Sequence, residues 1–362
     1  EKWGMKMKNC PGSRPAPESG APVSRWKRIR ALFGRSRLHA FLVWGPLYLL
    51  LLGAWLWCVG AVYYAFHWSG ASVAVFAGTL LAFWLISVRR RRFLAVVGAV
   101  ELAVIGAFLA MTPERMFADV VWQKPWGRAP TVEFVGSRVM LHNVRDFHYR
   151  SVDDYDIRYT DFCIDPSTVR TVDVAVSHWD GLQAIAHTML SFGFADGRYL
   201  AVSMETRLPE GVEQGFLPGL YHQYEILMIL ATEEDLFKLR TDYRHEELYL
   251  YRTNATPAQA RELLDYVILR ADSLSRHPEF YNSITRNCTT SLGPLLRVID
   301  PTFEGDLRLL LNGYSDELLF ELGYLKHQEE ETFPELKKRR LADLYAALPS
   351  ELGYSELIRT NL

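Results

Sequence analysis

Three long apolar runs fill most of the first third of the chain. They cover residues 40–66, 71–88 and 93–111, and the only charged residue inside them is Glu101. Crossing the core of a bilayer takes about 20 apolar residues in a helix. None of the runs has the polar face that a helix on a soluble core would show. The pattern therefore predicts three transmembrane helices within residues 40–111.

Basic residues flank these runs on one side of the predicted membrane. Six Arg and Lys side chains lie within residues 25–37 and four Arg within 89–92, whereas the link between the first two runs has none. The positive-inside rule then places residues 1–39 in the cytoplasm and everything after the third helix outside. The length of the first run, with a second directly after it, predicts an anchor rather than a cleaved signal peptide.

Charge is divided unevenly along the chain. Residues 1–111 carry 14 Lys and Arg against 3 Asp and Glu, while the whole 362-residue chain has a net charge of −2. The exterior part is therefore acidic, which argues against nucleic acid as a partner. Glu101 is interpretable as a functional intramembrane carboxylate or as a protonated or snorkelling residue packed on a neighbouring helix. The second interpretation is favoured, because the other spans offer no partner charge.

Prolines and two tryptophans mark residues 112–130, which we expect to form a juxtamembrane connector. Trp122 and Trp126 suit either the bilayer interface or packing on the domain that follows.

Residues 131–362 show strand patterns first and helix patterns afterwards, which predicts an α+β domain. A helix should open at Thr256, with Pro257 and Gln259 completing its N-terminal signature, and continue to Ser275. Another should begin at Asn287 and Cys288. The expected strands are residues 138–149, 171–179, 184–194, 198–206, 221–230 and 247–251, and a last helix is expected over 335–348.

A hairpin in the middle of this domain defines a candidate site. A three-residue loop over 195–197, with Gly197 in the left-handed conformation, sets His187 opposite Glu205. This register gathers the large apolar residues of both strands on one face and puts His187, Ser203 and Glu205 on the other. A two-residue loop would mix the faces. A carboxylate beside an imidazole orients it and stabilises its charged form.

Cys288 is the candidate nucleophile. A thiol at a helix N-terminus near a protonated imidazole has a depressed pKa, and the thiolate is the attacking species. The Cys288 amide and the Asn287 side chain would line an oxyanion site. The alternatives are an inert buried thiol and a disulfide with Cys163. His178 is a weaker candidate, expected to be a turn or core residue. No metal or cofactor is expected, because the sequence contains no metal-ligand spacing or phosphate loop.

A set of short motifs extends from about residue 139 to the end of the chain. They are Ala186–Thr188, Ser191–Phe194, Asp196–Gly197, Ser203–Arg207, Gln223–Glu225, Tyr249–Tyr251, Phe280–Asn282, Asn287–Thr290, Glu351–Ser355 and Ile358–Arg359. Together these motifs resemble the Lnb-type bacterial lipoprotein N-acyltransferases. One departure precedes Gln223, where the family's aromatic–Arg pair is replaced by Tyr221 and His222.

This resemblance implies a circularly permuted papain-like (NlpC-type) domain, similar in architecture to lecithin retinol acyltransferase. It implies a catalytic set of Cys288, His187 and Glu205. The cysteine would take an acyl chain from a phospholipid and pass it to the N-terminal amine of a diacylated apolipoprotein, outside the bacterial inner membrane. Arg207, Tyr221, Arg286, Asn287 and Ser203 are candidates for binding headgroup or oxyanion.

Two other functions fit the same residues. With water as the acceptor, the chain would be a cysteine amidase or peptidase of the cell envelope. Without catalysis, it would be a membrane-tethered interaction domain. A water-accessible groove would favour hydrolysis, and an apolar channel would favour acyl transfer.

Overall fold

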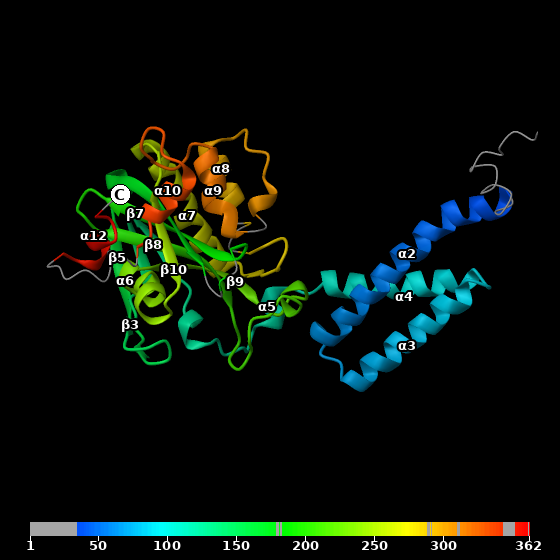
Figure 1. Ribbon diagram of the computed structural model, residues 1–362. Helices are drawn as coiled ribbons and strands as arrows, with labels where there is room; N and C mark the ends of the chain where they lie inside the picture. The colour runs from blue at the N-terminus through cyan, green and yellow to red at the C-terminus, as the bar shows by residue number, and fades with distance from the viewer. Residues whose placement is uncertain are drawn as a thin grey trace, which may run out of the picture. The chain divides into compact units, whose positions relative to one another are not determined.

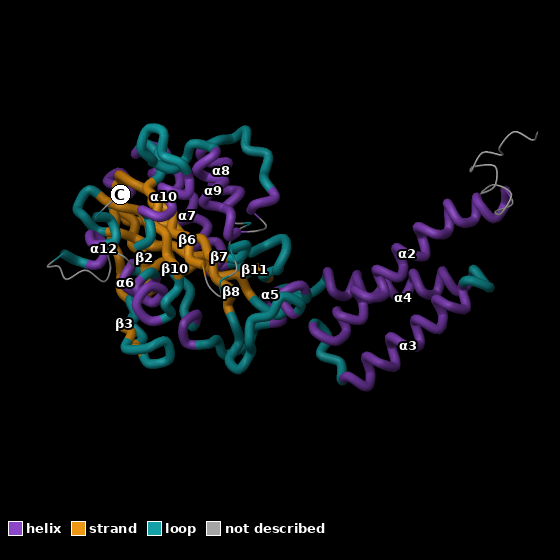
Figure 2. Tube along the Cα trace, viewed as in Figure 1, coloured by secondary structure: helices purple, strands orange, loops and turns teal. Residues whose placement is uncertain are grey.

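The computed structural model describes residues 35–178, 181, 183–287, 290, 292–309, 312–342, 352–360 and 362. Two compact units are distinguished within the chain: one comprises residues 1–59 and 74–103, and the other residues 60–73 and 104–362. The second unit contains the sheet and its covering helices, shown in Figures 1 and 2.

Three long apolar helices stand at the start of the described chain: α2 (Arg35–Tyr64), α3 (Gly70–Ser87) and α4 (Arg92–Leu109). All three are long and apolar enough to cross a membrane. Glu101 is buried within α4, and the thiol of Cys58 lies 3.8 Å from its carbonyl oxygen. This placement agrees with a residue packed against a neighbouring helix.

The sheet-rich domain follows, so the α+β class expected from the sequence is confirmed. Its main sheet runs in the order β1, β2, β9, β8, β7, β6, β10, with β5 paired to β2 and β11 to β9. All pairs are antiparallel except β2 with β9. The strands are β1 (Thr131–Val135), β2 (Arg138–Arg145), β5 (Tyr159–Ile164), β6 (Val169–His178), β7 (Ala186–Phe194), β8 (Tyr199–Arg207), β9 (Glu225–Ala231), β10 (Glu247–Arg252) and β11 (Glu279–Phe280). A separate pair joins β3 (His148–Tyr149) and β4 (Tyr155–Asp156).

Each face of the sheet buries its own apolar core, because successive strand residues point to opposite sides. One face packs against α7 (Pro257–Arg276), α8 (Leu292–Ile299) and α9 (Ser315–Glu321), as Figure 2 shows. The other face packs against α6 (Glu233–Leu236) and α12 (Tyr354–Leu357). The β7–β8 hairpin is thus buried on both sides.

Helix α7 begins as its sequence predicts. Thr256 accepts from the Gln259 amide, and the Gln259 side chain accepts from the Thr256 amide, which completes a capping box. Apolar residues three and four apart form its buried stripe, from Ala260 to Leu274. The helix ends at Arg276, just before Pro278.

Several expected boundaries were wrong. Strands β1 and β5 were not predicted, because their side chains are mostly exposed or half-buried and alternate weakly. The expected strand over 138–149 divides into β2 and β3. Strand β9 starts at Glu225 instead of residue 221, since His222 has a positive φ of 60° after a 3-10 turn, η3 (Pro218–Leu220).

The helix expected over 335–348 is confirmed only for its first residues. Helix α10 (Phe333–Arg339) stops early, and the chain then runs along the edge of β10. The amide of Leu250 donates to Arg340 O, and the amide of Ala342 donates to Leu248 O. Hydrogen bonds to an otherwise open strand edge outweigh further helix growth. Residues 343–350 lie outside the described part.

The connector over 112–130 carries a short helix, α5 (Pro113–Met116), and a 3-10 turn, η1 (Lys124–Trp126). Trp126 packs against the core on the α6 side, and Trp122 pairs with Pro209. Its tryptophans therefore pack on the domain, which is one of the two roles considered for them.

A buried ion cluster ties the C-terminal segment to the sheet. The Arg359 guanidinium donates to Asp173 Oδ2 at 2.9 Å and Glu233 Oε2 at 2.7 Å, and it lies 3.6 Å over the ring of Tyr199. The Asp173 and Glu233 side chains are 0% exposed. Buried carboxylates are tolerated only when paired, so this arginine holds the last helix in place.

Replacing Arg359 with Met should lower the free energy of unfolding by about 3–5 kcal/mol, because it leaves the buried Glu233 carboxylate without its arginine and Asp173 with Arg252 alone. Arg261→Met is the matched control, since Arg261 forms an exposed ion pair with Asp265 worth about 0.3–0.5 kcal/mol. Urea unfolding of the full chain in detergent, followed by near-ultraviolet circular dichroism, measures both. Equal midpoints for the two variants would contradict this role.

Candidate active site

His187 and Glu205 meet on neighbouring strands of the hairpin. Phe194 accepts from Gly197 across the three-residue loop, and Gly197 has φ +83°, as expected. The register then pairs Met189 with Ser203. Continuing this antiparallel pairing by two residues on each strand sets His187 opposite Glu205. Nε2 of the imidazole lies 3.1 Å from Glu205 Oε1. The predicted register is confirmed.

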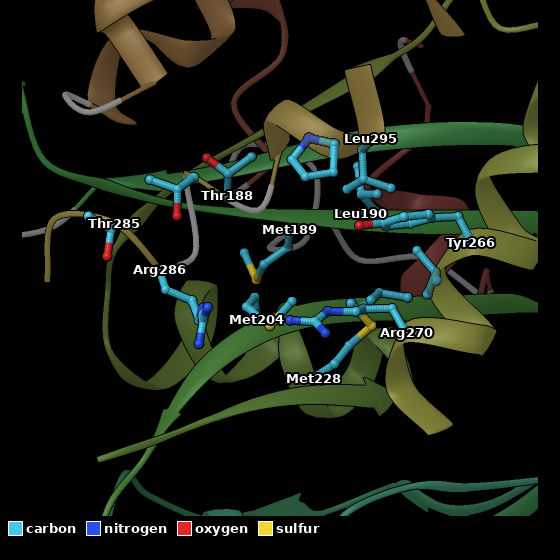
Figure 3. A pocket seen from close by; sticks show the side chains of 14 residues that line it. Thr188, Met189, Leu190, Met204, Met228, Tyr266, Arg270, Thr285, Arg286 and Leu295 are labelled. Carbon is cyan, nitrogen blue, oxygen red and sulfur yellow. The ribbon is translucent and has the colours of Figure 1, made fainter. Parts of the chain in front are cut away.

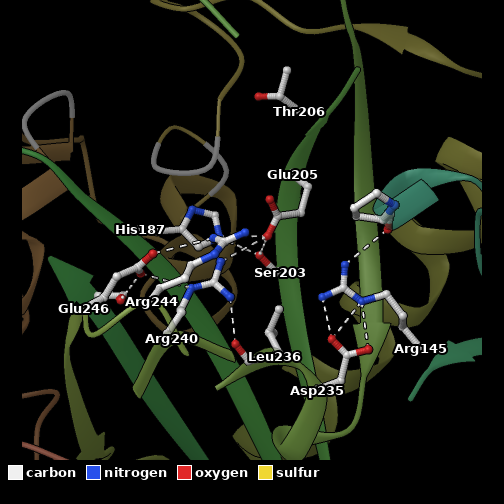
Figure 4. A network of polar contacts seen from close by, with 12 residues as sticks. Arg145, His187, Ser203, Glu205, Thr206, Asp235, Leu236, Arg240, Arg244 and Glu246 are labelled. Atoms are coloured by element: carbon white, nitrogen blue, oxygen red, sulfur yellow. Dashed lines mark hydrogen bonds and ion pairs between the residues drawn. The ribbon is translucent and has the colours of Figure 1, made fainter. Parts of the chain in front are cut away.

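Ser203 completes this contact, as Figure 4 shows. Its hydroxyl donates to Glu205 Oε1 at 2.5 Å and lies 2.6 Å from His187 Nε2. Because the hydroxyl hydrogen points to the carboxylate, Nε2 carries the proton and donates to Ser203 and Glu205. This bonding selects one tautomer of the imidazole, in which Nδ1 holds the lone pair.

Arg240 supports Glu205 from the other side. It lies in a π-helical turn, η4 (Leu239–Tyr243), is 5% exposed, and places Nη2 3.5 Å from Glu205 Oε1. Burial alone would raise the pKa of Glu205, but His187 and Arg240 outweigh it and hold this pKa well below its usual range. The carboxylate therefore stays ionised from neutral pH down through the normal titration range of a glutamate, and its pairing is lost only below that range.

A second carboxylate extends the network away from the imidazole. Ser177 pairs with His187 across β6 and β7, and its hydroxyl donates to Glu246 Oε2 at 2.6 Å. The same oxygen lies 3.6 Å from Arg240 Nε. Sequence reasoning missed Arg240 and Glu246, because they lie in an irregular segment without periodicity. Only the register of β6 with β7 could have drawn attention to Ser177.

Cys288 lies outside the described residues, and so does Thr289. On either side of them, Asn287 and Thr290 form a turn: Asn287 Oδ1 accepts from the Thr290 amide, and the Asn287 amide donates to Thr290 Oγ1, both at 2.9 Å. Asn287 thus caps a turn, which suits the cap role predicted for it. Its Nδ2 donates to Ser283 O.

A cavity of about 270 Å³ connects this segment with the strand of His187. Thr188 and Met189 line it from β7, and Thr285, Arg286 and Thr290 line it from the segment around Cys288. Figure 3 shows Thr188, Thr285 and Arg286 at one end. Since His187 and Thr188 point to opposite faces of the sheet, the imidazole and the cavity flank the first residues of β7 from two sides.

The remaining predicted site residues have defined positions. Arg286 is half exposed at the cavity and lies 3.4 Å from Glu279. Arg207 contacts Glu225, donates to the carbonyls of the connector, and lies over the ring of Trp122. Its guanidinium therefore fastens the connector to β8.

Tyr221 and His222 are both engaged in ring stacking. Within the second unit, Tyr221 is buried and stacks on Tyr64, while His222 lies between the rings of Phe108 and Phe280 at 4.0 and 3.8 Å. Burial and the nearby charge of Arg286 lower the pKa of His222 to about 4, so its ring is neutral at physiological pH.

His178 and Cys163 fit structural roles. His178 is buried edge-on against Tyr249, and its Nε2 accepts from Lys337 Nζ at 3.3 Å. Burial and Lys337 lower the pKa of His178, which keeps it neutral. Cys163 is a free thiol on β5, so the disulfide considered for it is not formed.

Comparison with known proteins agrees with the resemblance read from the motifs. Residues 157–313 match the family model described as the Lnb N-terminal periplasmic domain. The matched region includes β7, β8 and the segment around Asn287. No curated protein and no solved structure matches the chain.

Removing the imidazole or its carboxylate should slow alkylation of Cys288. His187→Asn and Glu205→Gln should each reduce the iodoacetamide rate at neutral pH by about tenfold, because less thiolate is present without a stabilised imidazolium. Mass spectrometry of the Cys288 peptide measures this rate. The free thiol of Cys163 serves as an internal control for unfolding. An unchanged Cys288 rate in both variants would mean that the pair does not activate this thiol.

Proposed function

Because residues 157–313 match the family model of the Lnb N-terminal periplasmic domain, we propose that this chain is a membrane-anchored N-acyltransferase that acylates lipoproteins. Its acyl donor is a phospholipid. Its acceptor is the α-amine of the lipidated N-terminal cysteine of a diacylated apolipoprotein. Cys288 is the nucleophile, His187 the base and Glu205 the residue that orients the base.

The first half-reaction transfers the acyl group to the enzyme. Nδ1 of His187 takes the proton of the Cys288 thiol, since Nε2 is held by Ser203 and Glu205. The thiolate attacks the ester carbonyl and a thioester forms. The C–O bond breaks, and the lysophospholipid oxygen leaves with the proton from the imidazolium.

The second half-reaction returns the thiol. The lipoprotein amine attacks the thioester carbonyl, the C–S bond breaks, and an amide forms. His187 takes the proton lost by the amine and gives it to the departing thiolate. Glu205 stays ionised throughout, because His187 and Arg240 lower its pKa, and it stabilises the imidazolium in both steps.

The apolar character of the cavity beside the Cys288 segment is the observation that carries this proposal. Its walls include three methionines, Met189, Met204 and Met228, together with aliphatic side chains of the sheet and of α7. Such walls suit an alkyl chain, and unbranched Met side chains adapt to a flexible ligand. A hydrolase of cell-wall peptides would need a polar groove at this place.

The three apolar helices support the same function. Both substrates are confined to a membrane, so anchoring the enzyme beside them raises their effective concentration. In the proposed topology residues 1–39 are cytoplasmic, the helices cross the bacterial inner membrane, and the sheet domain is periplasmic.

Complementation tests the proposal directly. In a strain that lacks its own lipoprotein N-acylation, the wild-type chain should add the mass of one acyl chain to the N-terminal peptide of a reporter lipoprotein. Cys288→Ala should add none, because the thioester cannot form, and the matched control Cys163→Ala should behave as wild type. Mass spectrometry of the lipopeptide is the measurement.

Two outcomes would overturn the proposal. Equal peptide masses with the wild type and Cys288→Ala would exclude acyl transfer to the reporter. Release of free fatty acid or of cleaved cell-wall peptide by the wild type, with no gain of mass on the lipoprotein, would show that water is the acceptor.

A further inference from the structure

A second apolar cavity adjoins the one beside the Cys288 segment. It has a volume of about 320 Å³ and lies between the sheet, α7, α8 and α9. The two cavities share two wall residues, Leu190 of β7 and Leu295 of α8. In Figure 3 both leucines lie at the end of the first cavity opposite Thr188, Thr285 and Arg286. The pair therefore separates one cavity from the next.

The two cavities differ in polarity. The first has Thr188, Thr285 and Arg286 at one end, whereas the second is walled mainly by aliphatic side chains: Val172, Val174, Leu263, Leu296, Ile299 and Leu319. A path that starts polar and continues apolar matches the two ends of an acyl group, since its carbonyl needs polar neighbours and its methylenes do not.

Charge at the first cavity fits a phospholipid donor. Arg270 makes a two-pronged contact with Glu279, at 2.6 and 2.9 Å, so its charge is neutralised inside the wall. Arg286 lies 3.4 Å from the same carboxylate, with its side chain 48% exposed. Two guanidinium groups thus share one carboxylate, which leaves a net positive charge near the segment of Cys288. A lipid phosphate is the anion that suits it.

We propose that the two cavities form one acyl-chain site and that Leu190 and Leu295 are the constriction that sets chain length. This inference rests on the proposed function. The carbonyl carbon is bonded to the Cys288 sulfur in the proposed thioester, the first methylenes fill the methionine-lined cavity, and longer chains pass the two leucines into the second cavity. Neither cavity is large for a whole ligand, but together they fall within the range of about 300–1,000 Å³ usual for enclosed ligands.

In such a site, the length of the acyl chain that binds depends on the volume of the side chains at the constriction. Each methylene moved from water into an apolar site strengthens binding by about fourfold. A larger side chain at the constriction blocks the second cavity, because the closely packed wall cannot move aside without strain. The chain then loses the binding energy of every methylene beyond the constriction. A larger side chain deep in the second cavity affects only the ends of the longest chains.

The test uses the full chain in vesicles that contain phospholipids of one headgroup and graded acyl length. After a short reaction without acceptor, mass spectrometry of the Cys288 peptide gives the ratio of long-chain to short-chain adducts. Leu295→Phe should lower this ratio by about 15-fold, the loss of roughly two methylenes. Leu319→Phe should reduce only the longest adduct. The exposed Leu322→Phe is the matched control and should leave the ratio unchanged.

The outcomes distinguish failure of the proposed function from failure of the acyl-chain site. No adduct on wild-type Cys288 would overturn the proposed function and, with it, this inference. Adducts with the same length distribution in wild type, Leu295→Phe and Leu319→Phe would overturn the acyl-chain site alone. Leu295→Ala widens the constriction and should therefore enrich the longest adducts. With this variant the test does not depend on accommodating a larger side chain.

Discussion

The register of the β7–β8 hairpin is the constraint on which the site depends. Both faces of this hairpin are buried, so a shift by one residue would move the apolar side chains of one face into the polar network and the polar side chains into the apolar core. Gly197, with its positive φ, permits the three-residue loop that sets the pairing. The same pairing places His187 opposite Glu205, so the stability of the sheet and the geometry of the acid–base pair have one origin.

Burial on both faces also explains why Glu205 is surrounded by positive and hydrogen-bonding groups. Glu205 is enclosed, and an enclosed carboxylate is stable only beside positive or hydrogen-bonding groups. His187, Ser203 and Arg240 provide these, and the helix-poor side of the sheet supplies Arg240 from an irregular turn. The opposite face of the sheet is different, because apolar cavities lie between Leu190 and the helices α7 and α8. The polar network and the apolar cavities thereby lie on opposite sides of one sheet.

Sequence patterns succeeded where one local rule decides the structure. The capping box at Thr256 and the three-residue loop at Gly197 depend on a few adjacent residues, and both formed as expected. Patterns failed where distant groups compete. Residues 340–342 continue a helical sequence pattern, but the open edge of β10 offers their backbone better partners. Strands β1 and β5 were not predicted, because apolar and polar residues alternate too weakly in half-exposed strands.

The sequence by itself determined the three apolar helices, the two-faced hairpin and the facing of His187 and Glu205. Each follows from hydrophobic periodicity or turn geometry within a short stretch of chain. Only the tertiary structure brought Arg240 and Glu246 to this pair, joined Arg359 to Asp173 and Glu233, and placed two cavities on either side of Leu190 and Leu295. Those contacts join residues far apart in the chain, and no local pattern records which distant side chains the packing of two cores will bring together.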